Sequence, residues 1–336
     1  MKRLNPRYLV TLTLLLLPLS LVIALTLGPE IINPLELFDV FATPSSNQLI
    51  LEKIRLPRAL MAAIIGATLA VAGVMMQGLF RNPLADPSLI GVTSGASAGA
   101  SLAIVLGAGS AIAGVSFIAL GAFAGAVLAT IIVYRLASSS GGTSVATMLL
   151  AGIAISALAG ALNSFFQYIA DNHMLRQISL WQMGSLNGSS WPRLAMAYGV
   201  LGTLLLWMPR YSRALNAMLL GESEARHLGI YVDRVKRQII ILVALVVGVA
   251  VALSGTISFV GLITPHIIRL LIGPDHRYLI PCSALAGAIL LILADAVSRI
   301  AIAPSELPIG VVTAVLGAPF FLSLLRQQRN ASLIAR

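Results

Sequence analysis

Charged residues are scarce in this sequence. Of its 336 residues only 10% are charged and 58% are hydrophobic, whereas an ordinary soluble domain carries about 25% charge. So little charge cannot cover a water-facing surface, which excludes a soluble globular protein. The apolar runs exceed about 18 residues, the length of a membrane-spanning helix, and they lack the short alternation of a β-barrel. The predicted fold class is therefore an all-α polytopic membrane protein.

Cysteine and acidic residues are also few. Cys282 is the single cysteine, which excludes an internal disulfide and a metal site built from several cysteines. The chain has 12 acidic residues, and only Asp295 lies inside a predicted span. This disfavours a proton-coupled pump, because such pumps use intramembrane carboxylates. An ion-driven secondary transporter stays open as the rival hypothesis from another class.

Nucleotide-binding and catalytic motifs are missing as well. The pattern G-x-x-x-x-G-K-[ST], which cradles phosphates, does not occur, and the glycine-rich run 141–144 has no lysine. The sequence offers no nucleophile elbow, no metal-ligand cluster and no paired carboxylates within the membrane. We therefore expect no enzyme activity and no cofactor or metal bound by this chain.

Ten apolar spans divide the chain into one transmembrane domain over residues 1–336. The first span follows Lys2 and Arg3 and is long enough to cross a membrane, so we interpret it as a retained helix. An even number of spans places both termini on the same side, which we interpret as the cytoplasm. Most of the 22 lysines and arginines then fall on the cytoplasmic side, as the positive-inside rule requires. This topology accounts for the net charge of +10 without any nucleic acid. The predicted spans are approximately 8–28, 57–80, 88–107, 112–135, 144–170, 192–209, 237–254, 258–272, 279–302 and 308–325.

One polar segment interrupts the apolar sequence, between Arg210 and Arg237. It carries six basic and three acidic residues between two hydrophobic halves, so it must lie in water. We interpret residues 210–237, hereafter the coupling segment, as a cytoplasmic handle through which another protein moves the membrane helices.

A few basic residues remain on the outer side and break the charge rule. Arg55 and Arg58 flank Pro57 at the start of the second span, and Arg299 lies near the end of the ninth. They are either anchors at the lipid headgroups or a docking patch for an acidic protein. Asp295 precedes Arg299 by four positions, so the two side chains are expected to pair on one helix face.

Small and polar residues mark the third to fifth spans. Gly95 and Gly99, and likewise Gly121 and Gly125, have the G-x-x-x-G spacing that lets helices approach closely. In the fifth span a polar stripe recurs on one helix face. Because amides are costly in lipid, this stripe indicates either hydrogen bonds between helices or the wall of a water-filled path. Its members are Gly152, Ser156, Gly160, Asn163 and Gln167.

The stripe leads into an outer segment that begins at Tyr168 and continues through residues 171–188. It mixes aromatic, soft and cationic side chains. His173 and Met174 are hypothetical transient contacts for a haem iron, although a lone histidine at a helix end is more often only solvated. Arg176 is better suited to a carboxylate, which a guanidinium can bind in a bidentate manner.

Three runs resemble the signatures of the FecCD-type permeases, the ABC importers of iron-siderophores, haem and cobalamin. The run RLPRALMAAIIGATLAVAGVMMQGLFRNPLADPSLIGV covers residues 55–92, LLGESEARHLG covers 219–229, and GLITPHIIRL covers 261–270. The resemblance implies ten helices per subunit in the bacterial inner membrane. It also implies a homodimer around a central pathway, two ATPase subunits that bind ATP and Mg²⁺, and a periplasmic substrate-binding protein.

The resemblance also implies roles for particular residues. Arg55, Arg58 and Arg299 match the arginines that dock the binding protein. The fifth helix, with Ser156, Gly160, Asn163, Gln167 and Tyr168, matches the pathway wall, and Arg176 follows it. The outer run DNHMLRQISLWQMGSL is similar to the haem branch, which favours haem as the substrate over a ferric siderophore or cobalamin. The residues that match the ATPase contact are Gly221, Glu222, Ala225, Leu228 and Gly229.

Overall fold

The computed structural model describes residues 4–34, 46–107, 111–112, 115–139 and 142–334. The interpretation of Lys2 and Arg3, and part of the glycine-rich run 141–144, lie outside these residues. The elements in chain order are α1 Pro6–Thr26, α2 Ser46–Ile50, η2 Leu51–Arg55, α3 Leu56–Leu79, η3 Pro87–Ile90, α4 Val92–Val105, β1 Ala111–Ile112, β2 Val115–Ser116, α5 Phe117–Ala137, β3 Ser138–Ser139, β4 Gly142–Thr143, α6 Val145–Ile169, α7 Asn172–Gln182, α8 Trp191–Ala197, η4 Tyr198–Gly202, α9 Thr203–Trp207, η5 Met208–Tyr211, α10 Ser212–Met218, α11 Glu222–His227, α12 Val232–Ser254, α13 Val260–Ile272, α14 His276–Ile300 and α15 Ile309–Ile334.

Each of the predicted spans is occupied by helical structure. In the described part of the chain six helical stretches are long and apolar enough to cross a membrane. Three shorter apolar helices occupy Val92–Val105, Val260–Ile272 and Ile309–Ser323. The sixth predicted span is a run of short helical pieces from α8 to η5. The prediction of an all-α membrane fold with about ten spans is confirmed.

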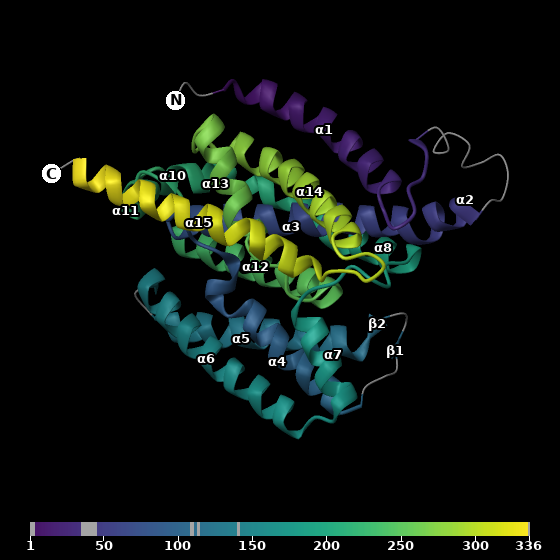
Figure 1. Cartoon of the computed structure of the whole chain (residues 1–336). Helices are drawn as coiled ribbons and strands as arrows, with labels where there is room; N and C mark the ends of the chain where they lie inside the picture. Colours follow the sequence, from purple (N-terminus) through teal and green to yellow (C-terminus); the bar gives the residue numbers. More distant parts are fainter. Residues whose placement is uncertain (1–3, 35–45, 108–110, 113–114, 140–141, 335–336) are drawn as a thin grey trace.

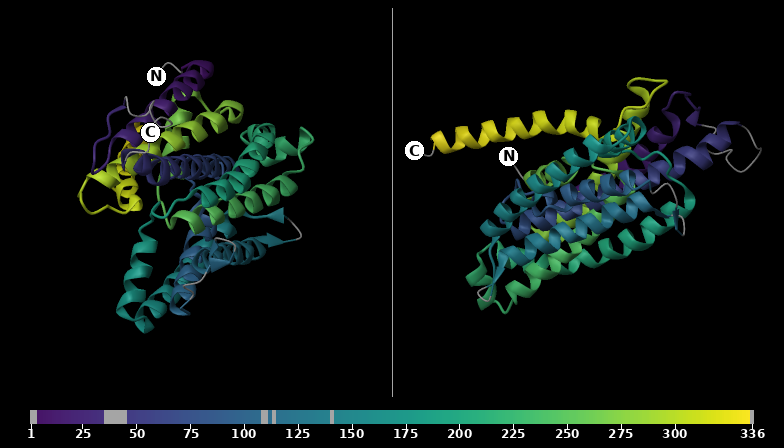
Figure 2. Two further views of the ribbon diagram at one scale, coloured as in Figure 1. Left: turned by 90° about the vertical axis from the view of Figure 1, so that its right-hand side faces the viewer. Right: turned by 90° about the horizontal axis from the view of Figure 1, so that it is seen from below.

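The helices run back and forth between two ends of the molecule (Figure 1). The start of α1, the end of α15 and the short helices α10 and α11 lie at one end, which we call the inner end. The outer end carries α2, α8 and the β1–β2 hairpin. The coupling segment therefore shares its side with both termini. Figure 2, in its right-hand view, shows α15 extending beyond the other helices.

The second predicted span was placed too late in the sequence. Its helix begins at Ser46 and continues through α2, η2 and α3, whereas Pro57 suggested a start near residue 57. Proline lacks a backbone N–H, and a helix tolerates it where a π-turn has already shifted the hydrogen bonds. The π-turn of residues 51–55, in which the Leu56 amide donates to the Leu51 carbonyl, provides this adjustment.

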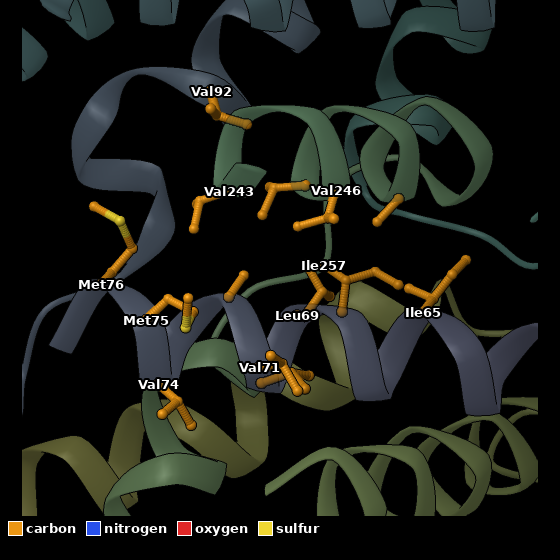
Figure 3. Packing of buried hydrophobic residues seen from close by; sticks show 14 of the residues in the cluster. Ile65, Leu69, Val71, Val74, Met75, Met76, Val92, Val243, Val246 and Ile257 are labelled. Atoms are coloured by element: carbon orange, nitrogen blue, oxygen red, sulfur yellow. The ribbon is translucent and has the colours of Figure 1, made fainter. Parts of the chain in front are cut away.

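Helix α3 is the centre of the apolar core (Figure 3). Almost every residue from Pro57 to Leu79 is buried, and α12, α13 and α14 all pack against it. Ile65, Met75 and Met76 are fully enclosed. A helix that is apolar around most of its circumference is expected to be buried on all sides.

Glycines set the closest helix contacts. A Cβ atom at Gly99 would collide with the carbonyl of Gly121, and one at Gly95 would collide with the carbonyl of Gly125. The predicted close approach of these two G-x-x-x-G pairs, which lie on α4 and α5, is thus confirmed. Gly66 of α3 and Gly287 of α14 face each other in the same way, because a Cβ on either one would meet the other's carbonyl.

Candidate functional site

A polar cleft lies between α4 and α6. It has a volume of about 490 Å³ and is bordered on α6 by Gly152, Ser156, Gly160 and Asn163. The Ser156 hydroxyl lies 2.9 Å from that of Ser94. A Cβ at Gly152 would meet the Leu89 carbonyl, whereas the space beside Gly160 is open. Helix α6 therefore touches η3 closely at Gly152 and leaves room at Gly160.

Asn163 is held in place by two hydroxyls from α4. Its Oδ1 accepts a hydrogen bond of 2.7 Å from Ser101, and its Nδ2 donates one of 3.0 Å to Ser97. Of the two alternatives left open by the sequence, hydrogen bonds between helices are observed. The stripe also borders a cleft, and its role as the wall of a water-filled path stays a prediction. Ser94, Ser97 and Ser101 of α4 were not among the predicted site residues, although their spacing of three and four positions indicates that they share a helix face.

Irregular backbone completes the cleft. Thr256 and Ser258 line it and belong to the short stretch between α12 and α13. Helix α13 has 13 residues, and at about 1.5 Å per residue it is too short to cross a hydrocarbon core of about 30 Å. The non-helical stretch must therefore lie at membrane depth, where such backbone is tolerated only in contact with protein or a water-filled cavity.

The remaining predicted pathway residues lie outside this cleft. Gln167 is half-buried, Tyr168 is 87% exposed and Arg176 is exposed. Arg176 and His173 are three positions apart on α7, an amphipathic outer helix that the sequence did not predict. Its N-cap is Asp171, whose carboxylate accepts from the Met174 amide at 2.8 Å. In the described part of the chain no group of three His, Cys, Asp or Glu side chains could hold a metal ion.

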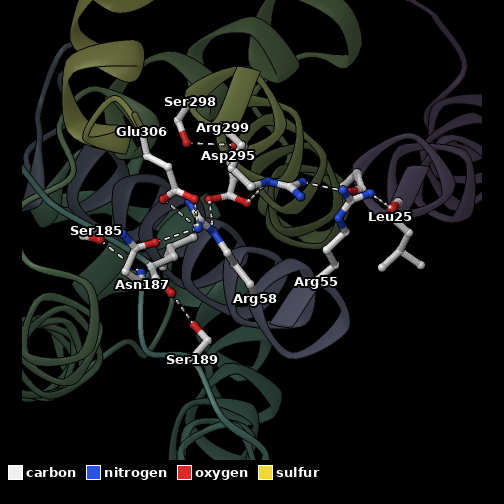
Figure 4. A network of polar contacts seen from close by, with 12 residues as sticks. Leu25, Arg55, Arg58, Ser185, Asn187, Ser189, Asp295, Ser298, Arg299 and Glu306 are labelled. Carbon is white, nitrogen blue, oxygen red and sulfur yellow. Dashed lines mark hydrogen bonds and ion pairs between the residues drawn. The ribbon is translucent and has the colours of Figure 1, made fainter. Parts of the chain in front are cut away.

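The three outer arginines are buried in a charged network (Figure 4). Arg55, Arg58 and Arg299 are only 5%, 7% and 4% exposed. Arg58 Nε lies 2.8 Å from Asp295 Oδ1, and its Nη1 lies 2.9 Å from Glu306 Oε2. Arg299 Nε is 3.3 Å from the other oxygen of Asp295. The predicted pairing of Asp295 with Arg299 is confirmed, and Asp295 balances two guanidinium groups at once.

Backbone carbonyls satisfy the rest of this network. Arg55 Nη1 donates to the Leu25 carbonyl at 2.7 Å, and Arg299 Nη2 donates to the Ala24 carbonyl at 2.7 Å. A side chain at Gly28 would collide with the guanidinium of Arg55. These contacts join the outer end of α1 to η2 and α14. The arginines therefore do not extend into the headgroups as free anchors, and their docking role stays a prediction.

The coupling segment forms the two short helices α10 and α11 at the inner end and continues into the start of α12. Ala225 of α11 is fully buried, whereas Leu228 is 63% exposed. Gly221 and Gly229 border the helix with φ of +127° and +80°. After α11 the amides of Gly229 and Ile230 donate to the carbonyls of Arg226 and Ala225. This is the Schellman pattern, in which a left-handed glycine ends a helix.

The coupling segment is tied to α14 at its base. Asn216 of α10 donates to Asp275 Oδ1 at 2.7 Å and accepts from the His276 amide at 2.9 Å. Partial burial acts to raise the pKa of the Asp275 carboxyl. Hydrogen bonds from the Arg277 and Asn216 amides outweigh it, so this pKa lies below its ordinary value. Asp275 is therefore charged at neutral pH and fixes α10 at the N-terminus of α14.

A second tie joins Glu222 to Lys236 on α12. Glu222 Oε1 lies 2.6 Å from Lys236 Nζ, and the same ammonium donates to the Thr143 carbonyl at 3.1 Å. Lys236 is 3% exposed. This burial could not be predicted, because Lys236 stands in a run of charged residues that is typical of a solvated surface.

Comparisons with known proteins agree with this architecture. The model of the FecCD transport family matches residues 14–327. The chain is 43% identical over 335 residues to the haemin transport system permease HmuU of Yersinia pestis, with 98% of each chain covered. It is also 43% identical over 297 residues to the cobalamin import system permease BtuC of Halobacterium salinarum, covering 87% of this chain and 78% of that protein.

Solved structures agree as well. An ABC transporter assigned to the metal-chelate type and solved in an inward-facing conformation matches with a TM-score of 0.81 and 35% identity, over 96% of this chain and all of the other. PsaBC of Streptococcus pneumoniae, solved with a Fab, shares the fold with a TM-score of 0.57 and 21% identity, over 82% and 92% of the two chains. The family match spans nearly every helix, including those that border the cleft and form the coupling segment, and on that ground the chain belongs to the FecCD transport family.

Proposed function

We propose that this chain is the permease subunit of an ATP-driven ABC importer that carries haem across the bacterial inner membrane. The observation that carries the proposal is the polar cleft on α6. Ser156, Asn163 and Thr256 are polar residues that border this cleft in an otherwise apolar bundle. Polar groups at membrane depth are costly, and they generally mark the route of a substrate or ion.

The assembly that we propose has two copies of this chain and two ATPase subunits, which hold ATP and Mg²⁺. The ATPase subunits would bind the coupling segment. Leu220, Leu228 and Tyr231 are 69%, 63% and 75% exposed at the inner end. Beside them lies a hollow of about 590 Å³ bordered by Arg226, Gly229 and Arg234. Exposed apolar side chains next to a hollow rimmed by charge are typical of protein interaction sites.

A periplasmic binding protein would dock at the outer end. The docking role of Arg55, Arg58 and Arg299 would be indirect, because all three are buried beneath this surface. Arg58 positions Glu306, whose side chain is one-third exposed and can reach a partner. A direct ion pair between these arginines and an acidic partner would require the loop that carries Glu306 to move first.

Haem is favoured as the substrate by the exposed face of α7. His173 and Arg176 lie three positions apart and both are exposed, while Met174 beside them is half-buried. A guanidinium suits a propionate carboxylate, and imidazole and thioether groups are ligands of haem iron. Relatives that carry haemin and cobalamin are equally similar in sequence to this chain, so the proposal of haem depends on these side chains.

Replacing Arg176 with glutamine is expected to lower haem uptake about tenfold, because a hydrogen bond to a charged group contributes about 1.5 kcal/mol or more. Uptake of cobalamin, if any occurs, should change little. Initial rates of uptake into liposomes measure both effects. The control is Lys53→Gln, which removes another outer cation that is 62% exposed and pairs with Glu52. Equal losses in the two variants would show that Arg176 acts only through general surface charge.

The decisive test of the proposal is reconstitution in liposomes with and without the ATPase subunit. We expect haem to enter only with the ATPase and ATP, and faster than cobalamin or a ferric siderophore. Faster entry of cobalamin or siderophore would reassign the substrate while keeping the importer. Uptake that follows membrane potential and ignores the ATPase would favour the ion-driven rival and contradict the proposal.

A further inference from the structure

Lys236 lies at the meeting point of three segments that are distant in sequence. It stands in the second turn of α12, and its ammonium contacts a carboxylate of α11 and a backbone carbonyl of β4. Its side chain is 4% exposed and that of Glu222 is 33% exposed. An ammonium group removed from water needs polar partners, because burying it unpaired is strongly unfavourable. Glu222 and Thr143 supply them.

Thr143 belongs to the connection between α5 and α6. Strands β3 and β4 pair in antiparallel fashion, with Ser138 opposite Thr143, and the hydroxyls of these two residues lie 3.1 Å apart. The next residue, Ser144, is the N-cap of α6 and donates its amide to the Ala137 carbonyl at 3.0 Å. A displacement of Thr143 is therefore passed directly to the first turn of α6, the helix that borders the polar cleft.

The neighbouring contacts place α11 and the β3–β4 connection on the same face of α12. Asp233, three positions before Lys236, pairs with Arg226 of α11 at 3.4 Å. A Cβ at Gly142 would meet the carboxylate of Asp233. The pair of Asp233 and Arg226 is about half exposed on both sides, so it contributes little. The buried contact between Lys236 and Glu222, rather than the exposed pair, therefore holds α11 against α12.

We propose that Lys236 is a positioning residue that transmits movement of α11 to α6, by holding Glu222 and the Thr143 carbonyl together on one ammonium group. This inference rests on the proposed function, in which ATPase subunits move the coupling segment. It adds the route by which that movement reaches the cleft. A lysine suits this place because its compact charge carries three donors that can serve two acceptors at once.

The test uses the complete complex of permease and ATPase in liposomes, with ATP hydrolysis and haem uptake measured together. Lys236→Met keeps most of the side-chain volume and removes the charge. We expect the rate of ATP hydrolysis to stay close to that of the parent, while uptake per ATP falls about tenfold, within the usual range of coupling between sites. Lys236→Arg should recover part of the loss. The control Arg135→Gln removes an exposed cation in the last turn of α5, outside the coupling segment, and should leave both rates unchanged.

A charge exchange separates transmission from simple anchoring. Glu222→Lys combined with Lys236→Glu restores an ion pair between α11 and α12 but places a carboxylate against the Thr143 carbonyl. We expect uptake per ATP to stay low in this double variant. Recovery to the parent value would mean that the pair only anchors α11, and would overturn the inference.

A distance measurement keeps the test decisive if Lys236→Met fails to fold. Spin labels are placed at Ser223 of α11 and Ala146 of α6, both exposed, in a chain whose single cysteine is replaced by Cys282→Ser. If Lys236 makes α11 and α6 move together, the distance between the labels in the parent should stay the same when vanadate traps the ATPase. In Glu222→Gln, which lacks the ion pair, this distance should change. The same shift in both chains would overturn the inference. If the parent itself shows no ATP-driven uptake of any candidate substrate, the proposed function fails instead.

Discussion

Replacing Asp295 with alanine is expected to lower the free energy of unfolding by about 3–5 kcal/mol, the usual effect of removing one partner from a buried ion pair. The expected loss is large because Asp295 is 1% exposed and faces both Arg58 and Arg299. Without it, Glu306 would be the counter-charge left near the two buried guanidinium groups among the described residues. Thermal unfolding in detergent measures the effect, with a dye that fluoresces on reacting with Cys282, which is completely buried.

Glu52→Ala is the control for Asp295→Ala. Glu52 pairs with Lys53 at 3.2 Å, but these side chains are 50% and 62% exposed. An exposed ion pair contributes at most about 1 kcal/mol, so this variant should unfold within a few degrees of the parent. If Asp295→Ala were equally mild, the network would not hold α3 and α14 together at their outer ends.

Replacing Gly66 with valine is expected to separate α3 from α14. A Cβ at Gly66 would collide with the Gly287 carbonyl and the Leu291 side chain, and two packed backbones cannot yield as a flexible side chain can. Overpacking typically costs about 1–3 kcal/mol, and more where backbone must move. We expect the yield of folded protein and its unfolding temperature to fall together, as size-exclusion chromatography and the dye assay would record.

The control for Gly66→Val is Gly160→Val. Both positions lie inside α-helices, so any effect of helix propensity is shared. The space beside Gly160 is open, and its valine variant should be as stable as the parent. A similar loss at both positions would attribute the effect to backbone propensity rather than to the contact between α3 and α14.

The membrane fold could be predicted because hydropathy acts locally. Each span is a continuous apolar run, and a helix must form there to satisfy its own backbone in lipid. The close contacts at Gly95, Gly99, Gly121 and Gly125 could likewise be predicted, since small residues at that spacing have few other uses. The start of the second helix at Ser46 could not be predicted, because no residue pattern in the sequence indicates the π-turn before Pro57.

The charged contacts could be predicted only where both partners lie on one helix. Asp295 and Arg299 satisfy that condition. Arg58 and Asp295 are 237 positions apart, and Lys236 is 93 positions from Thr143, so only the tertiary fold brings them together. The stripe on α6 was visible from its period. The serines of α4 that complete it were visible only as small residues, because their orientation depends on how the two helices pack.

The central claim is that the polar cleft on α6 is part of the route of the substrate. In a chain carrying Cys282→Ser, a cysteine at Ser156 lies in the cleft, whereas one at Leu128 of α5 lies on an exposed apolar surface elsewhere. The rate of reaction with a membrane-impermeant thiol reagent is measured for both in the assembled complex, with and without haem. We expect Ser156→Cys to react, haem to slow this reaction, and Leu128→Cys to stay unreactive. A reaction at position 156 that haem leaves unchanged, or no reaction there in any nucleotide state, would contradict it.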